Sequence, residues 1–82
     1  MDIHIYLNED QNLFLSLDVF QNETNNIFNC FINRKRVSIN KIIHIINNYK
    51  IDIKKWLDKQ DQFTHNKFIL FGRLLKMDMS CF

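Results

Sequence analysis

The sequence contains no proline and a single glycine, Gly72, among its 82 residues. Proline-rich linkers and glycine-rich phosphate-binding loops are therefore excluded. Turns must instead depend on asparagine and aspartate, whose side chains bond to nearby backbone groups and which tolerate left-handed conformations. The eleven asparagines are numerous enough for this role. Their abundance beside twelve isoleucines is typical of AT-rich genomes, including those of many viruses.

Long apolar runs and paired cysteines are also missing. The longest apolar run, Phe68 to Phe71, cannot cross a bilayer, and no basic segment followed by an apolar stretch opens the chain. Only Cys30 and Cys81 are available for a disulfide, and we interpret both as free thiols. We therefore expect a soluble, cytoplasmic protein that does not contact a membrane.

Basic residues are absent from the first 33 positions. This segment carries five acidic residues, a net charge of −5, whereas residues 34–82 carry eleven basic and four acidic residues, a net charge of +7. An apolar content of 46% is too high for intrinsic disorder, so we expect residues 1–82 to form one domain. Its acidic, β-rich part would be 1–33 and its basic, helical part 34–82. The basic part either meets a polyanion or is neutralised by the acidic part.

Apolar and polar residues alternate in the acidic segment with the period of two that half-buried strands require. The predicted strands are 3–7, 13–20 and 27–33. Residues 8–12 form the expected hairpin loop between the first two. Because Leu13, Leu17 and Phe20 also fit helical spacing, an all-α alternative remains open. We favour an α+β domain in which an antiparallel meander of two or three strands precedes two or three helices.

From Ser38 onward the apolar residues recur every three or four positions, as in an amphipathic helix with Ser38 as its N-cap. Residues 47–50 make a poor helix interior, which indicates an interruption that divides the segment into two helices. Asp52 is then expected to cap the second helix, which would run to about Gln60. A single bent helix is the alternative.

A final helix is predicted to begin near Thr64 or Asn66, and its apolar face is unusually wide. Such a helix is either central to the core or buried against another chain. A homodimer through this helix is one expectation. The candidate partner-interface residues are Phe68, Phe71, Leu75 and Met79.

The stretch from Ser38 to Leu57 resembles the helix-turn-helix of DNA-binding regulators, which needs inward apolar residues on both helices. Four residues have that spacing: Ile43, Ile46, Ile53 and Trp56. Asn47 would then take the left-handed turn position. The resemblance implies that the second helix enters the major groove and that nearby cations contact phosphates. The nucleic-acid-binding candidates are Arg34, Lys35, Arg36, Lys41, Lys54, Lys55 and Lys59.

A second resemblance reaches further upstream. Phe31 to Lys41, followed by Lys55-Trp56-Leu57, is similar to the strand, Ile-Asn-containing turn, helix and Trp-Leu of viral KilA-N domains. Membership of that family implies DNA binding.

Nothing in the sequence indicates catalysis. The three histidines are scattered, neither cysteine has another nearby, and we predict no metal site, cofactor or small-molecule substrate. We therefore predict a small nucleic-acid-binding regulatory protein that uses its basic helical segment, and not an enzyme. The alternative is a protein-interaction module, such as an adaptor, inhibitor or secretion chaperone. It would bind through the Phe-rich C-terminal helix or a strand edge.

Overall fold

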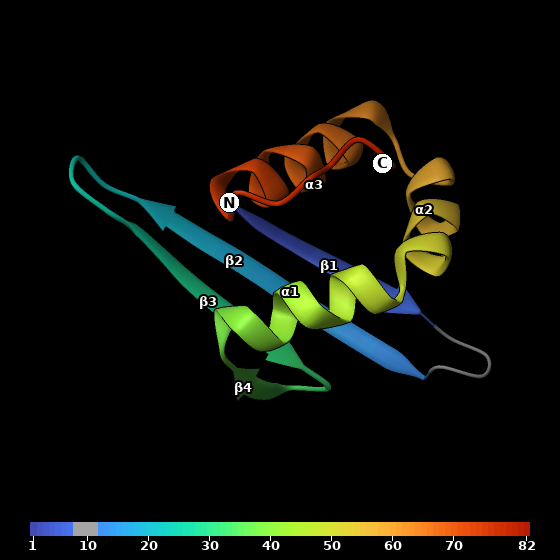
Figure 1. Cartoon of the computed structure of the whole chain (residues 1–82), viewed down its shortest axis with the longest axis horizontal. Coiled ribbons are helices and arrows are strands. Elements are labelled where there is room, and N and C mark those ends of the chain that lie inside the picture. Colours follow the sequence, from blue (N-terminus) through green and yellow to red (C-terminus); the bar gives the residue numbers. More distant parts are fainter. Residues whose placement is uncertain (8–11) are drawn as a thin grey trace.

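A four-stranded antiparallel sheet and three following helices make up the computed structural model, which describes residues 1–7 and 12–82 (Figure 1). The strands, in their order across the sheet, are β1 (Asp2–Leu7), β2 (Leu13–Gln21), β3 (Asn26–Ile32) and β4 (Lys35–Val37). The helices are α1 (Ile39–Asn48), α2 (Lys50–Asp58) and α3 (Gln62–Leu74). The predicted α+β architecture is confirmed, and the all-α alternative is wrong. Of the predicted loop 8–12, only Asn12 lies within the described residues.

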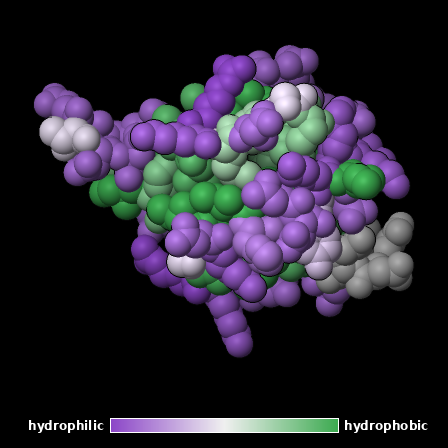
Figure 2. All heavy atoms as spheres, in the orientation of Figure 1, coloured by the Kyte–Doolittle hydropathy of each residue, from purple (hydrophilic) through white to green (hydrophobic). Residues whose placement is uncertain are grey.

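The period of two along the strands produces two different sheet faces. On the inner face, Ile5, Leu15 and Cys30 are buried, and so are the alternate residues of β1 and β2. The alternate residues of β3, Phe28 and Ile32, are half-buried against the same core. All three helices contribute buried side chains to the same core, so they cover this face. The alternate residues lie on the opposite side, which we call the open face. Seen from the helix side, polar side chains cover most of the surface, and apolar atoms remain visible between α1 and α3 (Figure 2).

The hairpin between β3 and β4 was not predicted from the sequence. Asn33 and Arg34 form its two-residue turn, and both have positive φ angles, 49° and 70°. This is the backbone of a type I′ turn, whose twist matches that of the flanking strands. The side chain of Asn33 accepts a hydrogen bond from the amide of Phe14 at 2.8 Å. The predicted third strand, 27–33, therefore ends one residue early, and a three-residue strand follows it.

Helices α1 and α2 confirm the predicted interruption and also correct its details. Ser38 caps α1, because its hydroxyl accepts a hydrogen bond from the amide of Lys41 at 3.2 Å. The break falls at Tyr49, with φ −118° and ψ 30°, so Asn47 is an ordinary helical residue. Asp52 lies in the first turn of α2 and is not its cap, and α2 ends at Asp58 instead of Gln60.

Helix α3 begins earlier than predicted, because Asp61 caps it by accepting a hydrogen bond from the amide of Thr64 at 2.8 Å. Its inner side chains, Phe68 and Phe71, are buried. Beyond the helix the chain folds back, and the ring of Phe82 packs edge-on against Phe68 with 5.1 Å between centroids. None of the helices described is long and apolar enough to cross a membrane.

Candidate nucleic-acid interface and the open face

Three exposed cations flank the short strand β4, and we call Arg34, Lys35 and Lys41 the basic corner. Arg34 stands in the turn before β4, Lys35 is its first residue, and Lys41 follows in α1. No aspartate or glutamate occurs between Glu23 and Asp52 in the sequence. Lys35 pairs with Ile32, an inner-face residue, and Lys41 stands in the first turn of α1. Lys35 and Lys41 therefore lie on the helix side of the molecule, and the whole corner lies within a stretch of chain that carries no carboxylate side chain.

Arg36 is separated from its two basic neighbours by the alternation of β4. It pairs with Phe31, and its Nη2 donates a hydrogen bond to the Oδ1 of Asn29 at 2.6 Å. Both partners lie on the open face. The predicted Arg34-Lys35-Arg36 cluster is therefore divided, because Lys35 and Arg36 lie on opposite faces of the sheet. Their adjacent positions in the sequence did not reveal this separation.

The other three candidate lysines, Lys54, Lys55 and Lys59, lie on α2 or directly after it. Lys54 makes an ion pair with Asp58 on the same helix, whereas Lys55 and Lys59 are exposed. Helix α2 begins beyond the far end of α1, whose ten residues span about 15 Å (Figure 1). The seven predicted nucleic-acid contacts thus do not form one footprint.

The helix-turn-helix geometry predicted for this region is wrong in one respect. Its turn required a left-handed Asn47, but Tyr49 alone separates the two helices. Ile46 and Ile53 are buried as predicted, whereas Ile43 is only half-buried. Trp56 is also half-buried and packs against the core. Strand, turn and helix do follow one another over residues 31–48, but β4 intervenes, and both family resemblances remain predictions.

The predicted partner-interface residues are core residues. Phe68, Phe71 and Met79 are 0%, 1% and 9% exposed, and Leu75 is half-buried. The wide apolar face of α3 is used within the chain, because the sheet and the returning C-terminal segment both pack against it. The exposed apolar side chains of α3 are instead Phe63 and Leu70, at 70% and 43%. Their separation of seven residues, two helical turns, was the signal that could have identified them.

The open face of the sheet carries several aromatic and apolar side chains that sequence reasoning missed. Tyr6 and Phe20 are 52% and 63% exposed, and Ile27 is 48% exposed. The rings of His4 and Phe14 stack with centroids 5.8 Å apart, and Tyr6 lies 6.2 Å from Phe14. Tyr6, Phe14 and Phe20 occupy the outward positions of their strands, where a sheet face exposed to water is normally polar. These aromatic residues were the sequence signal that could have identified the open face.

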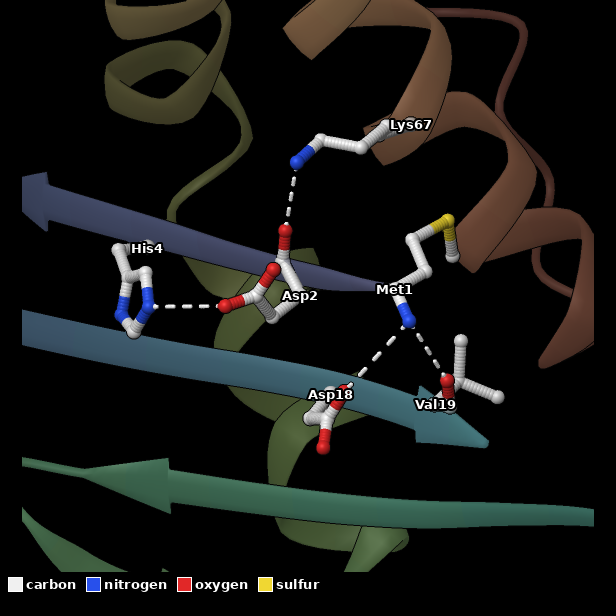
Figure 3. A network of polar contacts seen from close by, with 6 residues as sticks. All are labelled: Met1, Asp2, His4, Asp18, Val19 and Lys67. Carbon is white, nitrogen blue, oxygen red and sulfur yellow. Dashed lines mark hydrogen bonds and ion pairs between the residues drawn. The ribbon is translucent and has the colours of Figure 1, made fainter. Parts of the chain in front are cut away.

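The two acidic residues of the described part of this face lie close together near the start of β1 (Figure 3). Asp18 pairs with the N-terminal amine at 3.8 Å, and Asp2 pairs with the Nε2 of His4 at 3.5 Å. Lys67 reaches the same region, but its Nζ donates to the main-chain carbonyl of Asp2 at 2.8 Å. These contacts do not join Asp2 or Asp18 to a lysine or arginine side chain.

Both cysteines are free thiols, as predicted. Burial raises the pKa of the Cys30 thiol above its ordinary value, and Cys81 is exposed. Within residues 1–7 and 12–82, no three His, Cys, Asp or Glu side chains gather into a group that could hold a metal ion.

A hollow of about 550 Å³ lies between α3 and the returning C-terminal segment. Arg73 and Asp78 both line it, and the Nε2 of His65 lies 2.9 Å from the carbonyl of Phe82 beside them. Because its exposed charges are of both signs, the hollow does not favour one class of ligand.

Comparisons of the chain with protein-family models, with curated proteins and with solved structures found no significant match.

Proposed function

We propose that this protein binds nucleic acid and that the basic corner makes the phosphate contacts. The observation that carries the proposal is the presence of the exposed side chains of Arg34, Lys35 and Lys41 within eight residues, on a stretch of chain that has no carboxylate side chain. Asp2 and Asp18, which could have neutralised them, lie on the open face and pair elsewhere. Exposed lysine and arginine side chains of this kind bind phosphates by releasing condensed counterions.

The backbone at Arg34 supports this interpretation. Its φ of 70° lies in the left-handed region, where a residue with a β-carbon costs about 1 kcal/mol relative to glycine. Glycine after Asn33 would complete the most favourable sequence for such a turn. Glycine would remove this backbone strain, yet the position holds arginine. A residue that keeps avoidable strain suggests that its side chain has a function. A guanidinium at the tip of an exposed hairpin is well placed to contact a phosphate.

The test is the salt dependence of binding to a fluorescently labelled duplex, measured by anisotropy. Three phosphate contacts predict that log K falls with log salt concentration with a slope of about −2.7, or roughly a 40-fold loss of affinity between about 50 and about 200 mM salt. A single strand of the same length, measured in parallel, reports whether duplex geometry matters, because its slope is shallower, about −2.

The matched variants separate the two basic groups. The triple variant Arg34→Gly, Lys35→Gln and Lys41→Gln removes the corner, and it should reduce affinity and flatten the slope. The triple variant Lys54→Gln, Lys55→Gln and Lys59→Gln removes three charges from α2 and the residue after it, and it should keep most of the affinity. Equal losses in both variants, or no binding at the lower salt concentration, would contradict the assignment to the corner.

A second candidate function, a protein-binding module, is favoured by the outer side of α3. Phe63 and Leu70 are exposed there, and the Nζ of Lys67 lies 5.2 Å from the centroid of the Phe63 ring. An apolar helical ridge of this kind suits packing against a helix of another protein. Native mass spectrometry of the protein from its own cells would detect such a partner. The variant Phe63→Ser, Leu70→Ser should lose it, and Ile51→Ser, which alters an exposed isoleucine of α2, should not.

A further inference from the structure

The open face is an uncovered side of the sheet on which apolar residues recur. Register places Tyr6 beside Phe14 at one end and Phe20 beside Ile27 at the other. Phe31 lies between these ends, next to Arg36. The three helices described pack on the inner face, so none of them covers this surface. A sheet that exposes aromatic residues in this way has the properties of an unfilled interface.

We propose that the open face binds a second copy of this chain, so that two sheets pack face to face about a two-fold axis roughly parallel to their strands. This inference is independent of the proposed nucleic-acid binding. A two-fold contact requires a surface that complements itself. With the axis between β2 and β3, Phe20 of one copy meets Ile27 of the other, and the reverse contact repeats it.

Charge complementarity supports this arrangement. The β1 and β2 side of the open face carries Asp2 and Asp18, whereas Arg36 stands at the β4 edge. A two-fold axis along the strands sets the β1 edge of one copy over the β4 edge of the other. Each arginine then lies over β1 of the opposite copy at the level of His4, two residues along the strand from Asp2, and this occurs twice in the dimer. Such an arrangement fixes which edge meets which.

The available area is consistent with a weak dimer. Four strands spaced about 4.8 Å apart and about six residues long make a face of roughly 20 Å by 20 Å. Side chains enlarge this flat area, so two copies bury on the order of 1,000 Å² in total, near the lower limit for a specific interface. The same surface is a poor alternative site for nucleic acid, because Asp2 and Asp18 would repel phosphates.

The test is sedimentation velocity of the whole chain without nucleic acid, from micromolar to near-millimolar concentration. We expect the sedimentation coefficient to rise with concentration. Arg36→Glu should weaken association about tenfold or more, because like charges then face each other. Asp2→Arg combined with Arg36→Glu restores opposite charges across the interface and should recover dimerisation. Recovery by a second substitution cannot arise from misfolding.

Two controls keep this result separate from nucleic-acid binding. Phe20→Ser should abolish the dimer, whereas Phe63→Ser, which alters a similarly exposed phenylalanine on α3, should leave it intact. The corner variant Arg34→Gly, Lys35→Gln, Lys41→Gln should dimerise normally even if it no longer binds a duplex. A chain that stays monomeric throughout, or a dimer that Phe63→Ser weakens and Phe20→Ser does not, would overturn the proposal.

Discussion

Met79 lies directly against Gly72, although it follows the end of α3 and returns to the helix from outside. A β-carbon at position 72 would come within 2.8 Å of the Cγ of Met79, closer than carbon atoms approach each other. The amide of Met77 also bonds to the carbonyl of Gly72 at 2.9 Å. The single glycine of the sequence therefore accommodates a close approach of the Met79 side chain in the core and does not form a turn.

Replacing Gly72 with alanine should destabilise the fold. The added methyl group overpacks the contact with Met79, which typically costs about 1–3 kcal/mol, more than the helix propensity of alanine returns. Denaturant unfolding of Gly72→Ala measures the loss. In a Met79→Ala background the same glycine substitution should cost much less, because the obstructing side chain is gone. Equal costs in both backgrounds would show that this contact is not the cause.

Arg34→Gly should have the opposite effect on stability. Removing the β-carbon from a residue with φ of 70° should stabilise the chain by about 1 kcal/mol. Asn33→Ala is the matched change in the same turn, and it should destabilise the hairpin. It places a residue less tolerant of positive φ there and removes the 2.8 Å hydrogen bond from the amide of Phe14. Thermal unfolding of the two variants should therefore move in opposite directions from the parent.

The two thiols should differ strongly in reactivity. Cys81 is exposed, whereas Cys30 is 1% exposed, and burial holds its pKa above the ordinary value of 9.0. At neutral pH the Cys30 thiol is therefore both protonated and inaccessible, so alkylation followed by mass spectrometry should add one label quickly. The second label should appear only in denaturant. Two rapid additions in buffer would contradict the buried position of β3.

Asp61 should make part of the stability depend on acid pH. The amide of Thr64 bonds to its carboxylate and holds the pKa of that group below its ordinary value of 3.8. The contribution is fully present above pH 3.8 and is lost as the pH falls through the lower, folded-state value. Asp61→Asn keeps a capping oxygen without a titrating proton. It should therefore show a smaller decrease in melting temperature between neutral and acid pH.

Asp78 is the internal control for this measurement. The amide of Ser80 bonds to it and lowers its pKa in the same direction, so Asp78 also contributes stability that acid removes. Asp61→Asn should consequently leave a residual pH dependence, and adding Asp78→Asn should reduce it further. An unchanged pH dependence in the double variant would assign acid sensitivity to other carboxylates.

The strands and helices were predictable because the buried positions of each element recur at a fixed spacing, and apolar residues occupy those positions in the sequence. Alternation identified the first three strands, and the hydroxyl of Ser38 marked the start of α1. The fourth strand escaped detection because three residues are too few to show a period. Asp61 was overlooked as a cap, since the polar residues around it gave several possible helix starts.

The candidate site was less predictable than the fold. Linear spacing placed Lys35 and Arg36 together, but strand pairing sends neighbouring side chains to opposite faces. Phe68 and Phe71 suggested an interface because the sequence does not show that the C-terminal segment folds back over α3. An open sheet face could be inferred only after the register had shown which aromatic residues lie side by side.

The placement of Asp2 and Asp18 on one side of the sheet and of Lys35 and Lys41 on the other has a consequence at long range. In a single copy of the chain, this placement contributes to a dipole moment directed through the sheet, although the net charge is only +2. In the field of a polyanion such a molecule rotates before it collides, because the field exerts a torque on the dipole even where the net force is weak. The protein would thus approach a phosphate backbone with its helices leading.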